Sequence, residues 1–99
     1  MLNQSLQQLG FTDKEIAVYL CIQESGKLSA SDVSRIAKIN RTTVYSVTKE
    51  LIKKGVIHED LGGTNRYSTA LNPDELRSLY KIQAEDLKKK MEVIEETIQ

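Results

Sequence analysis

The sequence predicts a mainly α-helical domain that contains a two-stranded hairpin and ends in a long helix. Residues typical of helix starts recur before segments whose hydrophobic positions follow a period of 3.6 residues. The hydrophobic period changes to 2 over residues 56–60, which is typical of a strand. After the helix start at Asn72, the 99-residue chain has no further residue that would stop a helix.

The first two helices are defined by their start and stop residues. Gly10 ends a short opening helix, and Gly26 ends the second helix. Thr12 and Glu15 form a capping box at the start of this second helix, because the threonine side chain accepts from the backbone of Glu15 and the glutamate reaches back. We expect one face of the opening helix to carry Leu2, Leu6 and Leu9.

Two further helices joined by a tight turn follow, which indicates a helix-turn-helix. Ser29 and Asp32 are a second capping signature, and the helix that they begin ends near Lys38. Asn40 caps the next helix, which runs to about Lys54. The inward side of the first of these two helices is expected to carry Val33, Ile36 and Ala37.

The rest of the chain predicts a wing and a long helix. Residues 56–60 and 66–70 are expected strands, joined by a turn at 61–65 that contains two glycines. Asn72 caps a last helix of roughly 40 Å, which a core of this size cannot cover. The predicted fold is therefore a winged helix-turn-helix with a two-stranded wing, residues 1–71, and a long C-terminal dimerisation helix, residues 72–99.

Composition excludes several classes of protein. Cys21 cannot form an intrachain disulfide, and with His58 alone it cannot build a zinc site. We expect Cys21 to be a small core or boundary residue and His58 a partly exposed strand residue. The chain lacks a membrane-length apolar run, a secretory signal, a glycine-rich phosphate loop and a nucleophile paired with a base. We therefore expect a cytoplasmic protein that is not an enzyme and has no metal, cofactor or membrane contact.

Charge is unevenly distributed although the formal net charge is zero. Residues 34–66 contain seven basic and three acidic side chains, a net charge of +4. Residues 71–99 contain five basic and seven acidic side chains, a net charge of −2. A basic middle region is a hint of an anionic partner.

The helix at about 41–54 carries the candidate nucleic-acid contacts. Its expected buried stripe is Val44, Val47, Thr48 and Leu51. Its opposite side has side chains that can donate to phosphates and base edges, and no carboxylate precedes Glu50. The expected DNA-binding residues of the whole chain are Arg35, Arg41, Thr42, Thr43, Tyr45, Ser46, Lys49, Lys53, Thr64 and Arg66. We also count Lys38 and Lys54 among the possible phosphate partners.

The expected wing is poor in basic residues. Arg66 is the one cation near its tip, whereas Glu59 and Asp60 lie on the approach and would repel phosphate. Two interpretations stay open: a light phosphate contact by Arg66 helped by Thr64, and a wing that remains in solvent.

Several segments resemble the DNA-binding domain of TrmB-type transcriptional regulators. They are Leu9-Gly10-Phe11-Thr12-Asp13-Lys14-Glu15, Val18-Tyr19-Leu20, Asn40-Arg41-Thr42-Thr43-Val44-Tyr45-Ser46-Val47 and Lys53-Lys54-Gly55-Val56-Ile57. The Arg-Thr-x-Val-Tyr run is the most specific of them. The resemblance covers about residues 2–79 and implies a winged helix, dimerisation through a C-terminal helix and binding of promoter DNA. The chain has no room for the sugar-sensing domain that family members often carry, so the resemblance does not tell whether this chain has a sugar effector.

The last helix has a heptad seam of apolar residues. The seam residues, at spacings of 4 and 3, are Tyr80, Ala84, Leu87, Met91, Ile94 and Ile98. We expect a homodimeric coiled coil, and Lys90 facing the partner's Glu95 favours a parallel pair. Off the seam, Leu76, Leu79 and Ile82 are expected to pack on the domain.

Two functions from different classes remain. The first is a homodimeric, sequence-specific regulator that binds double-stranded DNA. The alternative is a winged-helix protein–protein interaction module of a transcription or other assembly, because a fold does not fix a function. The basic, carboxylate-poor helix favours DNA, whereas the neutral net charge and thin wing keep the alternative open.

Overall fold

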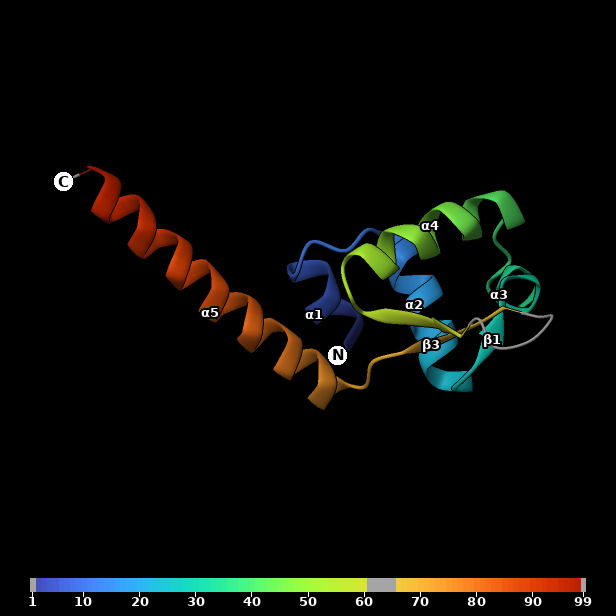
Figure 1. The fold of residues 1–99 in the computed structure, drawn as a ribbon. Helices are drawn as coiled ribbons and strands as arrows, with labels where there is room; N and C mark the ends of the chain where they lie inside the picture. The colour runs from blue at the N-terminus through green and yellow to red at the C-terminus, as the bar shows by residue number, and fades with distance from the viewer. Residues whose placement is uncertain (1, 61–65, 99) are drawn as a thin grey trace.

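The computed structural model describes residues 2–60 and 66–98, and it has the predicted order of helices and hairpin (Figure 1). The elements in chain order are α1 (Leu2–Gln8), α2 (Asp13–Ser25), β1 (Leu28–Ser29), α3 (Ala30–Ala37), α4 (Arg41–Lys53), β2 (Ile57–Asp60), β3 (Tyr67–Ala70) and α5 (Pro73–Ile98). The expected wing tip at 61–65 lies outside the described residues. The winged helix-turn-helix prediction is confirmed, with one extra strand.

That extra strand turns the expected two-stranded wing into a three-stranded antiparallel sheet in the order β1-β3-β2. In β1, Leu28 lies opposite Ser68 and Ser29 lies opposite Tyr67 of β3. A strand of two residues is too short to show an alternation of apolar and polar side chains, so the sequence pattern could not reveal it. Its effect is to join the start of α3 to the wing.

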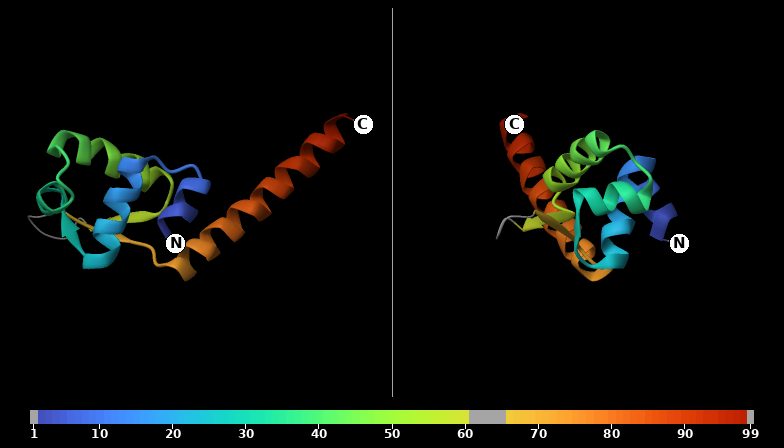
Figure 2. Two further views of the ribbon diagram at one scale, coloured as in Figure 1. Left: turned by 180° about the vertical axis from the view of Figure 1, so that it is seen from behind. Right: turned by 90° about the vertical axis from the view of Figure 1, so that its right-hand side faces the viewer.

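The core lies where α2 contacts α3, α4 and the sheet (Figure 2). Val18, Tyr19 and Ile22 of α2 are almost fully buried, as are Val44 and Leu51 of α4. The prediction that Tyr19 lies in the core is therefore confirmed. Its hydroxyl donates a hydrogen bond to the backbone carbonyl of Leu71, just before α5 begins.

The predicted helix caps are confirmed. The Thr12 hydroxyl accepts from the Glu15 amide at 3.1 Å, and a Glu15 carboxylate oxygen accepts from the Thr12 amide at 2.8 Å. Ser29 caps α3 and Asn40 caps α4 through equivalent side-chain contacts. Asn72 and Glu75 close a reciprocal box at the start of α5. Each cap satisfies amides that have no partner within the helix.

Three residues expected to face inward are exposed: Leu9 by 51%, Ile36 by 48% and Ile82 by 58%. α1 ends at Gln8, so Leu9 already belongs to the turn. α3 packs through a narrow stripe around Val33, and Ile36 lies to one side of it. The side chain of Leu2 is not among those described.

α5 projects away from the domain as a single helix (Figures 1 and 2). Leu76 is buried, and Leu79 and Tyr80 are half-buried, so the first two turns pack on the domain as predicted. Every described side chain from Lys81 to Ile98 is exposed. The domain therefore leaves most of α5 uncovered.

A nearly buried ion pair connects the start of α2 to the end of α4. Lys54 Nζ lies 3.0 Å from both carboxylate oxygens of Glu15, whose side chain is 5% exposed. The same ammonium lies 4.7 Å from the centre of the Phe11 ring. Burial raises the pKa of Glu15, but hydrogen bonds from Thr12 and Lys54 and the charge of Lys54 outweigh burial and hold this pKa below its ordinary value of 4.5.

We expect Glu15→Gln to lower the free energy of unfolding at pH 7 by about 1–2 kcal/mol, because the amide keeps the cap but loses the charge-assisted bond to Lys54. A lowered pKa means that the ionised carboxylate stabilises the fold above the ordinary pKa, and that this stabilisation disappears as the pH falls through the folded-state pKa. The difference in the free energy of unfolding between the variant and wild type should therefore disappear at acidic pH. Urea unfolding across this pH range measures it, with the exposed Glu24→Gln as control; a difference independent of pH would contradict the assignment.

Candidate nucleic-acid interface

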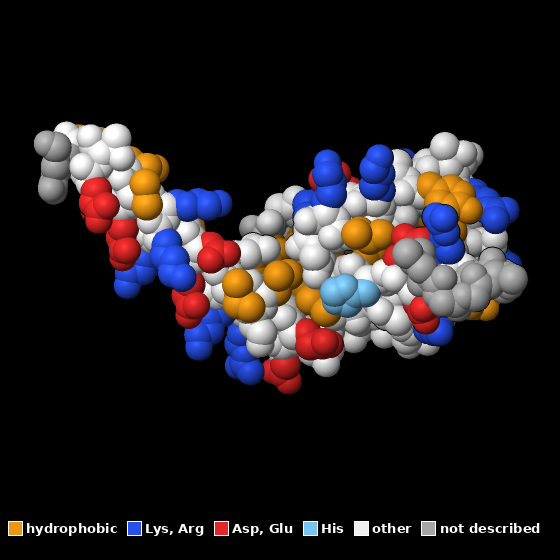
Figure 3. Space-filling view, in the orientation of Figure 1, with side chains coloured by type: hydrophobic (Ala, Val, Ile, Leu, Met, Phe, Trp, Pro, Cys, Tyr) orange, Lys and Arg blue, Asp and Glu red, His pale blue; other side chains and the backbone are white. Residues whose placement is uncertain are grey.

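One face of α4 is polar, basic and open to solvent. The predicted contacts exposed on it are Arg41, Thr42, Tyr45, Ser46, Lys49 and Lys53. Val44 and Leu51 on the opposite face are fully buried, and Val47 and Thr48 are half-buried, which confirms the predicted stripe. Figure 3 shows Lys and Arg side chains gathered along the outer edge of α4.

Hydrogen bonds within α4 determine which hydroxyls can donate to a ligand. The Ser46 hydroxyl donates to the Thr43 carbonyl at 3.1 Å, and the Thr48 hydroxyl donates to the Val44 and Tyr45 carbonyls. Thr43 itself is half-buried, so it lies at the margin of the exposed face. In this conformation Ser46 offers an outside partner its lone pairs, as an acceptor.

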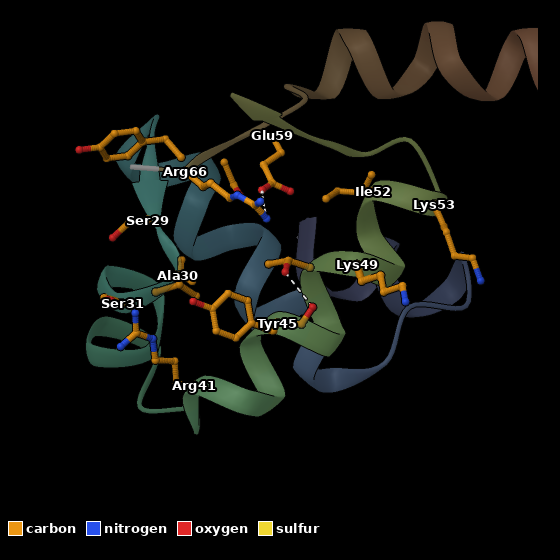
Figure 4. A pocket seen from close by; sticks show the side chains of 14 residues that line it. Ser29, Ala30, Ser31, Arg41, Tyr45, Lys49, Ile52, Lys53, Glu59 and Arg66 are labelled. Atoms are coloured by element: carbon orange, nitrogen blue, oxygen red, sulfur yellow. Dashed lines mark hydrogen bonds and ion pairs between the residues drawn. The ribbon is translucent and has the colours of Figure 1, made fainter. Parts of the chain in front are cut away.

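Tyr45 points outward, as predicted, and is 53% exposed. The Arg41 guanidinium lies 6.0 Å from the centre of its ring, at the outer limit of a cation–π contact. Figure 4 shows Tyr45 leaning from α4 towards Ala30 at the start of α3. The two side chains together place a cation and an aromatic ring at the N-terminal end of α4.

An open groove of about 690 Å³ lies between α4, the first turn of α3 and the sheet (Figure 4). α4 contributes the cations Arg41, Lys49 and Lys53 to its lining. The sheet contributes Arg66 together with Glu59. Sequence reasoning missed other lining residues, among them Ser31, Ile52 and Ser68, because the groove brings together segments that no local pattern connects.

The cations counted as possible phosphate partners are not equally available. Among the described residues, Lys38, Lys49 and Lys53 make no ion pair, whereas Arg35 pairs with Asp32 at 3.2 Å. The ammonium of Lys54 is held by Glu15, so it is less available to a phosphate than the ammonium groups of Lys38, Lys49 and Lys53.

Both acidic residues on the approach to the wing tip are paired with cations. Arg66 Nη1 lies 3.7 Å from Glu59 Oε1, and Lys27 Nζ lies 3.2 Å from Asp60 Oδ2. Lys27, which sequence reasoning missed, also lies 5.0 Å from the centre of the Tyr67 ring. Pairing reduces the repulsion of phosphate that we expected from this strand, while Arg66 stays 78% exposed. Thr64 lies outside the described residues.

The heptad seam forms an exposed apolar stripe along α5. Leu87, Met91, Ile94 and Ile98 are between 49% and 78% exposed. Tyr80, at the base of the seam, is half-buried against the domain. Exposure of this extent along one helix is typical of a surface that another chain covers.

Among residues 2–60 and 66–98, no group of His, Cys, Asp or Glu side chains is arranged to hold a metal ion. No helix in this part of the chain has the length and hydrophobicity needed to cross a membrane. Cys21 is half-buried, and burial raises the pKa of its thiol.

The family model described as "Sugar-specific transcriptional regulator TrmB" matches residues 6–74, which contain α2, α3, α4 and the sheet. The chain belongs to the TrmB family. A curated relative, the HTH-type sugar sensing transcriptional regulator TrmBL1 of Pyrococcus furiosus, is 34% identical over 71 residues, 72% of this chain. That alignment covers 20% of TrmBL1, so this chain spans a small part of the relative's length.

Solved structures support the same fold for this TrmB-family chain. TrmBL2, described as an archaeal chromatin protein with a novel mode of DNA binding, superposes with a TM-score of 0.78 at 22% identity. The match covers 96% of this chain and 38% of TrmBL2. S. aureus MepR in complex with DNA gives a TM-score of 0.55 at 18% identity over 99% of this chain and 89% of MepR. The fold is that of winged-helix transcriptional regulators.

Proposed function

We propose that this TrmB-family chain is a transcriptional regulator that binds double-stranded DNA sequence-specifically as a homodimer, with α4 in the major groove. The observation that carries the proposal is the exposed face of α4, where cations and hydroxyls precede the first carboxylate at Glu50. In a helix-turn-helix, the N-terminal half of the second helix reads base edges. On this face, Lys49 and Arg41 can donate to guanine, and Thr42 and Ser46 can contact several bases.

The wing and α3 supply backbone contacts in this proposal. Arg66 lies on the side of the groove opposite Lys49, so a duplex seated on α4 would meet both (Figure 4). Arg35 lies in the last turn of α3 and Lys38 caps its C-terminal end, close to where a phosphate backbone crosses in this class of motif. Such contacts fix the position of the protein on the duplex and carry little sequence information.

The dimer is proposed from the uncovered stripe on α5. The proposed dimerisation segment is residues 72–99, which include α5, and the proposed DNA-binding domain is residues 1–71. A parallel pair would place Lys90 beside the partner's Glu95. Two equivalent domains call for an inverted repeat with half-site centres about one helical turn apart. We expect such a regulator to act in the cytoplasm, on DNA.

Relatives support DNA as the partner. MepR is described as a complex with DNA, TrmBL2 as binding DNA, and TrmBL1 as a transcriptional regulator that senses sugar. No sugar effector is proposed for this chain, since it aligns with one fifth of TrmBL1.

We expect duplex binding to be strongly salt-dependent. Three or four phosphate contacts per domain, drawn from Arg35, Lys38, Arg41, Lys49, Lys53 and Arg66, let a dimer neutralise about six to eight phosphates, which gives a log–log salt slope of roughly −5 to −7. Fluorescence anisotropy with a selected genomic fragment at several salt concentrations measures the slope. Absence of duplex binding at low salt would overturn the proposal and favour the protein-interaction module.

A further inference from the structure

The C-terminal end of α4 touches the base of α5 at a small corner, defined here as Lys54 and Gly55 against Leu79 and Tyr80. A Cβ atom built on Gly55 would lie 3.6 Å from Leu79 Cδ1, so the leucine lies directly over this glycine. Burial raises the pKa of Tyr80, and the positive charge of Lys54 acts in the opposite direction. The corner therefore links the recognition helix to the dimerisation helix.

The α4 side of the corner is held rigidly. Gly55 has a φ of +79°, a conformation that L side chains rarely adopt, and it ends α4 sharply. Lys54 is fixed by Glu15 and by the Phe11 ring. Since Glu15 is in turn bound to Thr12, the corner is anchored to the N-terminal end of α2.

The α5 side of the corner is narrow. Leu76 is the one buried residue of α5, Leu79 and Tyr80 are half-buried, and each described side chain beyond them is exposed. The angle at which α5 leaves the domain therefore depends on few side chains (Figure 2). In a dimer joined along the outer part of α5, a rotation of each domain about this corner shifts its α4 relative to the α4 of the partner.

We propose that packing of Leu79 on the Lys54–Gly55 corner sets the distance between the two recognition helices of the dimer, and thereby the half-site spacing that the protein accepts. Leu79 and Lys54 are positioning residues, because neither contacts the bases. The inference rests on the dimeric, DNA-binding function proposed above, and it adds the residues that select operator geometry.

The test uses inverted repeats with identical half-sites and a centre-to-centre spacing varied around one helical turn, about 10 bp. Wild type should lose at least about tenfold in affinity when the spacing departs by two base pairs from its optimum, whereas Leu79→Ala should lose less than about threefold. Affinity for a single half-site should stay within about twofold of wild type, which separates positioning from base contact. Leu79→Met should show the same steep dependence of affinity on spacing as wild type. The exposed Val93→Ala on the same helix should leave that dependence unchanged.

A distance measurement made without DNA tests the role of the corner separately from the proposed DNA-binding function. A spin label at Glu50→Cys in a Cys21→Ser background reports the distance between the two α4 helices by pulsed electron resonance. Wild type should give one narrow distance, and Leu79→Ala should broaden or shift it. Lys54→Met, which keeps an unbranched side chain at the corner, is the second corner variant and should do the same if Leu79→Ala does not fold.

The outcomes are distinct. If the wild-type dimer binds DNA, and both corner variants have the same spacing profile and label distance as wild type, only the role proposed for the corner is contradicted. A wild-type dimer that does not bind duplex overturns the DNA-binding function, and the label distance still decides whether the corner sets the separation. If the wild-type chain is a monomer, both the proposed homodimer and the role proposed for the corner are contradicted.

Discussion

Replacing both Leu87 and Ile94 with lysine should convert the protein to a monomer. Each substitution places a charge in the middle of the proposed α5 seam, where an unpaired charge removed from water costs several kcal/mol. The dissociation constant of the dimer should therefore rise by at least about 100-fold, since each 1.4 kcal/mol is a factor of ten. Light scattering across a concentration series measures the change.

The chain offers a matched control for this experiment. Ile82 and Val93 lie on α5 off the seam, and their side chains are 58% and 62% exposed. Ile82→Lys with Val93→Lys adds the same charge to the same helix and should leave the dimer intact. A wild-type chain that stays monomeric at about 100 μM, a protein–protein affinity weaker than about −5.5 kcal/mol, would contradict the assignment of the seam.

Removing two polar side chains from α4 should lower the selectivity of DNA binding. In Ser46→Ala with Lys49→Ala, each lost base contact should reduce the preference for the selected site over scrambled DNA by roughly 1–3 kcal/mol. Arg66→Ala should weaken binding to both DNAs about equally, because it removes a backbone contact and leaves Glu59 without its cation. Equilibrium binding to the two duplexes at one salt concentration gives the ratio.

The comparison needs a variant that changes charge away from the groove. Lys89 is exposed on α5, so Lys89→Ala should leave the selectivity unchanged. If Arg66→Ala abolishes selectivity while the α4 pair preserves it, the wing reads the sequence and the assignment of α4 is wrong.

The sequence predicted what depends on neighbours in the chain. The capping residues Thr12, Ser29, Asn40 and Asn72 act within three residues of themselves, so their patterns located the helix starts. The outward face of α4 followed from the helical period alone, since burial of Val44 fixes where the rest of the helix points.

What could not be predicted depends on residues distant in sequence. Glu15 and Lys54 are separated by 39 positions, and neither has a local feature that reveals the other. The pairing of Lys27 with Asp60 likewise exists only once β3 pairs with both β1 and β2. Exposure of Ile36 shows the same limit, because an apolar residue near a helical stripe is buried only where another element lies over it.

In the proposed dimer, the exposed part of α5, residues 81–98, makes the folding of this helix depend on protein concentration. Most of the stability of a helix in a protein comes from packing of its amphipathic face, so this segment is less helical without a partner. Assembly and helix formation then become one equilibrium, whose midpoint depends on how much protein is present. Occupancy of an operator by two protomers rises with the square of the free protomer concentration when dimers are scarce. A modest change in expression would therefore give a steeper change in promoter occupancy, with no effector involved.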